Sequence, residues 1–496
     1  MLIKLTKVFH SCYFILMCLI MVEVVWKMIG GVYYWGLLLL PILYLGYLAS
    51  GGRLVRRRQI HINKNKLWLG ARFISVVVMF VTAYNLTVEL TWDWGYLLKQ
   101  AAFYAENDFA TQPSAYFAQY SNNSFWLLCL IALYKGIHFF YSRLDLDSFY
   151  YVSIAVSCLM MQISISYIHK AAKLLWGEEK AFKVGLFALL CAPFYVYSGF
   201  LYTDSPGMMF GIMLLYYYLK LKRESSMIKR VLYACIVGIT ASLCYMTKVM
   251  VFIIFIALLV DMIFSLKDIR CWGILMLLII VSTATAYKSI DRIVQAHITI
   301  TDEMQDRYKF PLTHWVMMGL GSSGGYSPDD VKYTFSFPSY KEKKEANIEE
   351  IKKRVKEHGF AGMAKHVFVD KMERMWCDSC MAGCDYISRS PKKPNSIFQK
   401  VFAMEGKWNP IFLQYSWAYY FILILGLFLS GQQAIKGNNS QNFFVGRVAI
   451  FGIILFFFLW ECNSRYLLVF LPVLILTAAD GFIAMREKYG HDLYCT

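Results

Sequence analysis

The chain has 496 residues, of which 58% are hydrophobic and only 17% are charged, with a formal net charge of +17. Soluble globular proteins carry roughly 25% charged residues, so this composition excludes a soluble multidomain protein. Continuous apolar runs such as Ile411–Leu429 also exclude the alternating pattern of a membrane β-barrel, and we predict an all-α polytopic membrane protein.

Thirteen apolar segments follow one another along the chain, and the first two form a predicted N-terminal transmembrane hairpin over residues 1–50. Lys4 and Lys7 precede the first segment as they would in a signal peptide, but no small-residue cleavage site follows. We therefore expect a retained anchor. The thirteen segments lie at 8–24, 32–50, 67–90, 124–141, 148–168, 184–201, 205–222, 231–247, 249–264, 271–289, 409–430, 444–461 and 465–484.

A basic stretch, Gly51–Lys66, separates the hairpin from the third segment and contains no acidic residue. Basic clusters beside membrane segments follow the positive-inside rule, which explains this stretch better than a phosphate-reading surface does. The stretch is therefore predicted to face the cytoplasm, and we expect no nucleic-acid partner.

The segment at 124–141 decides the topology of the middle of the chain. If it crossed the membrane, the Lys-rich stretches His169–Lys183 and Lys220–Arg230 would face outside, against the positive-inside rule. Polar residues, among them Lys135 and His138, interrupt it and favour an interfacial helix on the outer face. The prediction is about twelve transmembrane helices, with both termini inside the cell.

This topology divides the chain into four parts of a multi-pass cell-membrane protein. Residues 51–289 form the transmembrane core, whose outer loop spans 91–124. Residues 290–408 form a large, helix-containing extracytoplasmic loop, called the loop domain here, and residues 409–496 form the C-terminal transmembrane helices. Three polar regions thus share the extracytoplasmic face: the outer loop, the short turn at Asp204, and the loop domain.

Two stretches of the loop domain have readable patterns. Tyr340–His358 alternates charges as an exposed helix does, and Gly359 is placed to end it. Gly319–Tyr326, with the sequence GLGSSGGY, lacks the Gly-Lys-Ser/Thr ending of a P-loop. It is interpreted either as a mobile loop over a site or as a plain linker.

The loop domain also holds a cluster of three cysteines, Cys377, Cys380 and Cys384. Their spacing could hold a metal, but no fourth ligand follows at a suitable distance, so a disulfide is favoured over zinc. Which two of the three would pair is left open.

Two carboxylates lie at the outer ends of predicted spans. Asp93 follows the third segment in Thr91–Gly95 (TWDWG), where the tryptophans suit a membrane–water interface. Asp204 lies in the tight turn YTDSP, and an acid between two membrane helices is costly unless it faces a partner or a polar cavity. The alternatives are an exposed loop aspartate for Asp93 and a helix N-cap for Asp204.

Two cations and a third acid share the same predicted face. Lys248 occupies the turn between two apolar segments, and Arg465 follows Glu461 at the entrance to the last span. Lys248 and Arg465 together could clamp a phosphate at the membrane surface. The alternatives are a lysine that snorkels to the lipid headgroups and a helical Glu461–Arg465 pair.

Aromatic and amide side chains in the outer regions suit the binding of a polar ligand on a stacking surface. These candidate substrate-binding residues, with Glu461, are Tyr116, Tyr120, Asn122, Asn123 and His314.

The four charged motifs, in this order, resemble the C-type (GT-C) membrane glycosyltransferases that use lipid-phosphate sugars, near the protein O-mannosyltransferase and aminoarabinose-transferase group. The motifs are TWDWG around Asp93, YTDSP around Asp204, CYMTKVMVF around Lys248 and ECNSRYLLVFLP around Arg465, spread over about residues 85–480. The chain departs from the family in its extra N-terminal hairpin and in having one acid, not two, at the first motif. We therefore assign no metal ligand, and a divalent cation, Mg or Mn, stays open with no cofactor certain.

The resemblance implies a transfer of a hexosyl or pentosyl group on the extracytoplasmic face. The donor would be a polyprenyl-phosphate sugar held at the bilayer, and the acceptor a glycan, a lipid or a protein. Asp93 would act as general base in a single, inverting displacement, while Asp204 orients the acceptor, the base or a cation. Lys248 and Arg465 would stabilise the departing lipid phosphate.

Two other function classes compete with a transferase. A flippase or transporter for lipid-linked glycans would have charges near mid-membrane or inverted repeats, and neither is evident. A polysaccharide polymerase or ligase would use the same kind of donor, and the sequence does not separate it from a single-sugar transferase.

Overall fold

A computed structural model describes residues 2–31, 33, 64–107, 109, 114–264, 269–321, 323–437 and 443–492. The predicted segment 32–50 and most of the basic stretch 51–66 lie outside the described residues. Within the described ranges the chain is helical and has no strand; one isolated bridge joins Val88 to Pro391. The chain is thus an all-α protein, as predicted.

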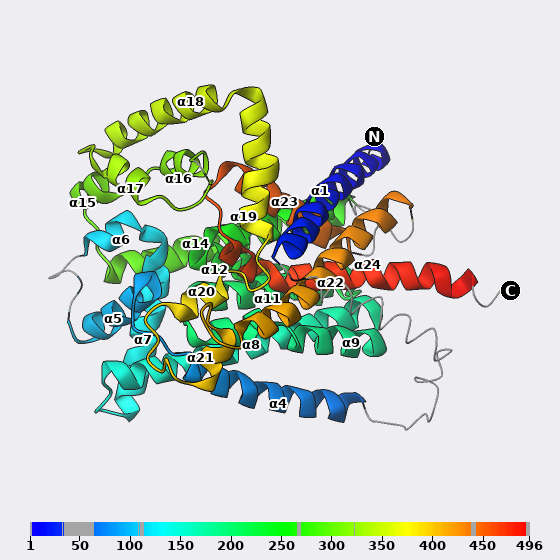
Figure 1. Cartoon of the computed structure of the whole chain (residues 1–496), viewed down its shortest axis with the longest axis horizontal. Coiled ribbons are helices and arrows are strands. Elements are labelled where there is room, and N and C mark those ends of the chain that lie inside the picture. Colours follow the sequence, from blue (N-terminus) through cyan, green and yellow to red (C-terminus); the bar gives the residue numbers. More distant parts are fainter. Residues whose placement is uncertain are drawn as a thin grey trace.

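The helices of the described part follow in chain order (Figure 1). The first group is α1 (Leu2–Gly30), α4 (Lys64–Asn85), α5 (Trp92–Glu106), α6 (Ala115–Gln119), η2 (Ser121–Asn123) and α7 (Ser124–Phe140). The second group is α8 (Leu146–Trp176), α9 (Glu178–Leu189), α10 (Ala192–Val196), η3 (Tyr197–Gly199), α11 (Asp204–Arg223), α12 (Met227–Thr247), η4 (Val249–Val251), α13 (Phe252–Phe264) and α14 (Ile269–His297).

The loop domain and the C-terminal spans make up the rest. The loop domain holds α15 (Asp302–Tyr308), α16 (Leu312–Gly319), α17 (Pro328–Phe335), α18 (Tyr340–Lys365), η5 (His366–Asp370), α19 (Lys371–Trp376), α20 (Gly383–Ser388) and α21 (Ile397–Phe402). The C-terminal spans are α22 (Asn409–Ile435), α23 (Phe444–Leu459), η6 (Ser464–Phe470) and α24 (Leu471–Asp492).

Eight helices of the described part are long and apolar enough to cross a membrane, and the bent pair of α9 with α10–η3 makes up to nine. The pair bends by 55°, and α13 and α23 are apolar but shorter. Each predicted span other than 32–50 corresponds to one of these helices or to α11. The chain is therefore a multi-pass membrane protein.

Charges divide the helix bundle into two ends. α11 begins at Asp204 and ends with Lys220, Lys222 and Arg223 in its last turn. α12 begins in a basic turn and ends at Thr247, just before Lys248. We call the end with the basic turns the basic end and the opposite end the site end. Figure 1 shows the beginning of α1 and the end of α24 on the side away from α5 and α6, toward the basic end.

Helix α7 packs against α5 beside the outer loop (Figure 1). It has the length and hydropathy of a span, yet both of its ends adjoin the site end. Asn123, just before it, bonds to Tyr116, and Tyr134 near its end bonds to the Leu144 carbonyl that precedes α8. Because α8 itself begins at the site end, where Asp147 pairs with a loop-domain lysine, this geometry favours the predicted interfacial helix.

The loop domain contains the predicted charged helix. α18 begins at Tyr340, with Ser339 accepting a hydrogen bond from the Glu342 backbone. The helix changes direction at Gly359, whose φ of 61° is readily adopted only by glycine (Figure 1). The helical run that begins at Tyr340 therefore ends at Gly359, as predicted, and a second helical run continues to Lys365.

The predicted disulfide in the cysteine cluster is wrong. Cys377, Cys380 and Cys384 are free thiols, and all three are buried. The Cys380 sulfur lies 3.2 Å from the Ser416 hydroxyl of α22, so the cluster packs the α19–α20 turn onto the membrane helices. The thiols act there as small apolar side chains.

A buried ion pair joins α23 to α24 near the basic end. The Arg447 guanidinium donates to the Asp480 carboxylate at 2.8 Å and to the Ser430 hydroxyl at 3.1 Å. Both charged side chains are almost fully buried. Arg447 lies in the first turn of α23, away from the middle of the span, so the pair is not where a midplane transport site would lie.

We expect Asp480→Leu to lower the free energy of unfolding by about 3–5 kcal/mol, because Arg447 would stay buried without its carboxylate. The double variant Arg447→Met/Asp480→Leu should recover most of that loss, because apolar residues replace both charges. Denaturant titration of the purified full chain in detergent measures both. A single variant as stable as the wild type would contradict the role given to this pair.

Candidate active site

Asp93 lies in the first turn of α5, at the site end. Its carboxylate accepts a hydrogen bond of 2.8 Å from the Tyr116 hydroxyl. Burial, followed by the nearby Tyr202 and Asp93, raises the pKa of Tyr116, so the phenol keeps the proton it donates. Asp93 is half-buried and is held in one orientation.

The two amides predicted to bind substrate, Asn122 and Asn123, form hydrogen bonds that hold the Tyr116 hydroxyl beside Asp93. Asn123 is buried and donates to the Tyr116 oxygen at 2.9 Å, while the exposed Asn122 donates to Asn123 at 3.2 Å. The Tyr120 ring packs 5.0 Å from the Tyr116 ring. Burial and the charge of Asp93 raise the pKa of Tyr120. The outer loop thus brings four of the predicted residues around Asp93.

The residue before Asp93 has an unusual backbone. Trp92 has a φ of 41°, a left-handed value that is strained for a bulky L-residue and recurs at functional sites. Its indole faces inward against Phe200, Tyr202 and Tyr386, with ring centroids 4.9–5.8 Å apart. Trp92 is half-buried and Trp94 is fully buried, so the prediction of a lipid-interface position is wrong for Trp94.

Asp204 and Lys248 form a buried ion pair between the first turn of α11 and the end of α12. Their side chains are only 6% and 11% exposed, so Lys248 points into the protein and does not snorkel to lipid. Asp204 is the first residue of α11 and caps no backbone group, so the N-cap alternative is wrong. The lysine ammonium also lies 5.4 Å from the Tyr466 ring centroid.

Arg465 is enclosed by aromatic rings at the beginning of η6. Its guanidinium carbon lies 4.9–5.7 Å from four ring centroids, those of Trp92, Tyr202, Tyr386 and Tyr466. The residue is only 9% exposed. Among the residues that the structure describes, no carboxylate is within salt-bridge distance of it, and its Nε has no hydrogen-bond partner.

Glu461 lies just outside η6 and is buried. Its carboxylate accepts a 2.7 Å hydrogen bond from the Tyr466 hydroxyl. Residues 461–463 are not helical, so the predicted alternative of a helical Glu461–Arg465 pair is wrong. Burial raises the pKa of Glu461, although Tyr466 and nearby cations act against that rise.

Tyr202 lies between Asp93 of the outer loop and the charged residues Asp204 and Arg465. Burial and the charge of Asp93 raise its pKa, while Arg465 lowers it and Asp204 raises it further. A single phenol therefore lies within electrostatic range of both aspartates and the arginine. We call Asp93, Asp204, Lys248, Glu461 and Arg465, with their aromatic neighbours, the charged cluster.

The loop domain is fixed to this cluster through its Gly/Ser-rich stretch. Backbone hydrogen bonds run from Glu461 to the Trp315 carbonyl and from Cys462 to the Gly324 carbonyl. A Cβ on Gly319 would lie 2.7 Å from the Leu459 carbonyl oxygen, so only glycine allows this approach.

A buried lysine reinforces the same junction. The Lys371 ammonium donates to the carbonyls of Gly319, Phe458 and Trp460 at 2.8–3.1 Å. Burial lowers the pKa of Lys371 to about 8. Arg374 donates to the Cys462 carbonyl at 3.2 Å. Gly319 and Gly324 therefore belong to an anchored joint between the loop domain and the chain leading into the last span.

His314 lies in the interior of the loop domain, apart from the residues that contact Asp93 or Arg465. It is fully buried, its Nδ1 lies 2.7 Å from the Thr334 hydroxyl, and its ring packs on Phe310. The adjacent Trp315, not His314, approaches Tyr120, with ring centroids 6.3 Å apart. Its predicted role in binding substrate gains no support from these contacts.

Burial lowers the pKa of His314 to about 4, so the folded chain keeps it neutral. The unfolded chain takes up this proton near pH 6.5, and acid therefore favours unfolding between pH 6.5 and 4. We expect the loop domain to lose about 3 kcal/mol across this window, and His314→Gln to lose much less. Hydrogen exchange of α16 in the full chain measures both, with the exposed His297→Gln as control. Equal losses in all three proteins would contradict this assignment.

A family model matches residues 11–482, nearly the whole chain, and is described as conserved hypothetical integral membrane protein. The chain belongs to this family of integral membrane proteins. No curated protein sequence matches the chain.

Solved structures with a similar chain path include two of an archaeal oligosaccharyltransferase from Archaeoglobus fulgidus. One is tethered to an acceptor peptide with an NVT sequon (14% identity, 84% of this chain and 50% of that one, TM-score 0.44). The other, AglB, holds an inhibitory peptide and a dolichol-phosphate (14% identity, 86% of this chain and 51% of that one, TM-score 0.45). The third is ArnT from Cupriavidus metallidurans bound to undecaprenyl phosphate (12% identity, 85% of this chain and 78% of that one, TM-score 0.38). The chain spans about half the length of the two archaeal proteins.

The charged cluster does not fit a divalent cation at Asp204. In this membrane protein the Asp204 carboxylate already holds the Lys248 ammonium, and Asp93 accepts from Tyr116. No group of three or more His, Cys, Asp or Glu side chains is arranged to hold a metal within the described ranges. We derive no step through a metal ion.

Several residues of the site were not predicted from the sequence. Tyr386 comes from the loop domain, and no motif marks it. Tyr202 and Tyr466 lie next to predicted charges, in YTDSP and SRYLL, so their position beside those motifs was the available signal. The left-handed backbone of Trp92 has no signature in the sequence, because it results from packing against distant elements.

Proposed function

We propose that this chain is a membrane glycosyltransferase that moves a sugar from a polyprenyl-phosphate donor to an acceptor on the extracytoplasmic face. The sugar is a hexose or a pentose, and the acceptor is a glycan, a lipid or a protein. The charged cluster at the outer ends of the spans is the proposed active site. A lipid phosphate would reach it from the bilayer while its sugar extends toward the loop domain.

The enclosed guanidinium of Arg465 carries this proposal. Burying a charge without a partner is costly, and natural proteins rarely leave an arginine in that state. Cation–π contacts with four rings offset part of the cost, by about 0.5–2 kcal/mol each. The N–H groups of Arg465 suit a phosphate, because a planar guanidinium can donate two parallel hydrogen bonds to it in a bidentate contact. Lys248, 5.4 Å from the same Tyr466 ring, supplies a second positive charge.

The proposed reaction is one displacement at the anomeric carbon. The acceptor oxygen forms a bond to that carbon and gives its proton to Asp93, which acts as general base. The bond from the carbon to the phosphate oxygen breaks, and its electron pair leaves with the polyprenyl phosphate. Arg465 and Lys248 stabilise the growing phosphate charge, and the single displacement inverts the configuration.

The ion pair gives Asp204 a narrower role than a contact with the acceptor. Because its carboxylate holds the Lys248 ammonium, Asp204 is proposed as a positioning residue for that cation. Tyr116 has the corresponding role for Asp93. The anchored Gly319–Tyr326 stretch would close the site from the loop-domain side and limit access of water to the donor.

Transfer is tested with membrane vesicles that contain the full chain and a radiolabelled polyprenyl-phosphate sugar. The expected result is label in a new, lipid-free or larger product, absent from vesicles that lack the chain. A flippase would instead change the side on which the labelled lipid is exposed and leave the label on that lipid. Label that never leaves the donor in the presence of candidate acceptors would contradict the proposed function.

A further inference from the structure

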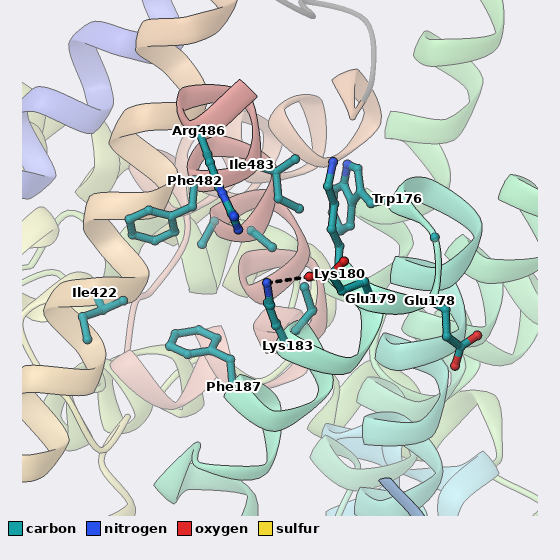
Figure 2. A pocket seen from close by; sticks show the side chains of 14 residues that line it. Trp176, Glu178, Glu179, Lys180, Lys183, Phe187, Ile422, Phe482, Ile483 and Arg486 are labelled. Carbon is teal, nitrogen blue, oxygen red and sulfur yellow. Dashed lines mark hydrogen bonds and ion pairs between the residues drawn. The ribbon is translucent and has the colours of Figure 1, made fainter. Parts of the chain in front are cut away.

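A pocket of about 840 Å³ opens at the basic end, between the beginning of α9 and the end of α24 (Figure 2). Its walls are mostly apolar and come from four helices, α8, α9, α22 and α24. The apolar residues of the walls include Phe187, Ile422, Phe482 and Ile483. Its size falls within the range of ligand pockets, roughly 300–1,000 Å³.

The mouth of this pocket carries charged side chains. Figure 2 shows Arg486 on α24 reaching toward Lys183 on α9 from the opposite wall. Lys183 bonds to Glu179 at 3.0 Å, and Glu178 pairs with Lys173. Lys180 also lines the pocket.

Basic side chains outnumber acidic ones in this region. The basic residues are Lys64, Lys173, Lys180, Lys183 and Arg486, and the acidic residues are Glu178 and Glu179. The pocket therefore combines an apolar interior with a positively charged mouth.

The pocket and the charged cluster lie at opposite ends of one span. Ser464–Arg486 is long and apolar enough to cross a membrane, with Arg465 at its beginning and Arg486 at its end. At about 2.0 Å per residue for the 3₁₀ part and 1.5 Å for the α part, the two arginines lie roughly 34 Å apart along the chain axis, close to the ~30 Å of a bilayer core. Trp176, which lines the mouth, suits the membrane–water interface.

We infer that this pocket binds an anionic phospholipid of the leaflet at the basic end, with an acyl chain against its apolar walls and the phosphate at Lys180, Lys183 and Arg486. Basic pockets between membrane helices on the cytoplasmic side are suited to acidic headgroups. By the positive-inside rule the basic end faces the cytoplasm, where such lipids are available. This inference does not depend on the proposed sugar transfer.

The test is native mass spectrometry of the purified full chain after titration with phosphatidylglycerol, phosphatidylcholine or undecaprenyl phosphate. We expect tighter binding of phosphatidylglycerol than of phosphatidylcholine. The variant Lys180→Gln/Lys183→Gln/Arg486→Gln should lose this preference, with phosphatidylglycerol binding weaker by on the order of 10–100-fold. Ala479→Phe, which keeps every charge and fills the pocket, should weaken both phospholipids. Lys353→Gln in the exposed part of α18 is the matched control and should bind as the wild type does.

Several outcomes would overturn the inference. Equal binding of the two phospholipids, or unchanged binding in both pocket variants, would mean that the pocket is not a headgroup site. Retention of undecaprenyl phosphate alone would mean that the occupant is the polyprenyl-phosphate carrier, not an anionic phospholipid. Absence of any retained lipid would mean that another part of this chain covers the pocket. If the charge variant fails to fold, Ala479→Phe alone still decides between these outcomes.

Discussion

Replacing Asp93 by Asn is expected to lower the turnover of sugar transfer by at least about 10²-fold, with the protein folded and the donor still bound. The amide keeps the size of the carboxylate and can still accept from the Tyr116 hydroxyl, which is 2.8 Å away. It cannot take a proton from the acceptor, and a positioned general base contributes roughly 10²–10⁴-fold to such a step. The measurement is single-turnover transfer from a radiolabelled polyprenyl-phosphate sugar in vesicles that contain equal amounts of each protein.

Glu89→Gln is the matched control for this variant. Glu89 is exposed on the same connection between α4 and α5, so its replacement removes one negative charge from the same region without touching the proposed base. The control should transfer as the wild type does. If Asp93→Asn also keeps wild-type turnover, Asp93 is not the base, and the buried Glu461 carboxylate becomes the next residue to test.

Arg465→Gln is expected to lower transfer by about 10²–10³-fold, the usual cost of removing a donor that stabilises developing charge. We also expect it to abolish the rise in melting temperature that undecaprenyl phosphate gives the wild type, because a ligand stabilises only the state that binds it. The melting temperature without lipid should change little. The variant loses the stabilising free energy of four cation–π contacts. It also loses the free-energy cost of burying a charge that lacks a carboxylate partner, and we expect the two changes to offset each other.

Arg389→Gln separates anion binding from ring stacking. Arg389 also lies over the Tyr386 ring, at 4.3 Å, but it is half-exposed and pairs with Asp385. Its replacement should leave the lipid-dependent rise in melting temperature intact. If instead Arg465→Gln loses stability without lipid and keeps the lipid response, the arginine has a structural role and the proposed phosphate site is wrong.

The sequence was sufficient for the helical class and for most of the charged cluster, for one physical reason. Ionisable residues are expensive inside the bilayer, so those at span ends mark the two membrane faces, and parity along the chain assigns them to a face. Asp204 and Lys248 could be placed together in this way, and the structure joins them in an ion pair. The same reasoning could not tell that Lys248 faces inward, because orientation depends on packing between α11 and α12.

Features of the site that depend on distant contacts were not predictable. The aromatic ring set around Arg465 needs Tyr386, which is 79 residues earlier in the chain and belongs to another part of the fold. A histidine such as His314 can bind a ligand or lie buried in the core. The sequence does not separate these two cases, because they differ only in the residues that surround the ring in the fold. The cysteine cluster has the spacing of a covalent or metal site, yet its sulfurs pack against α22.

The joint between the loop domain and the last span limits how this protein can be changed by recombination. Tyr386 of the loop domain lies 4.9 Å from Arg465, while Lys371 and Arg374 hold the chain that leads into η6. The loop domain, which we propose faces the acceptor, thus also forms a wall of the site proposed to hold the donor phosphate. Exchanging the loop domain between relatives to alter the acceptor would remove that wall unless residues 458–466 were exchanged with it. Acceptor choice and donor binding are therefore expected to evolve together.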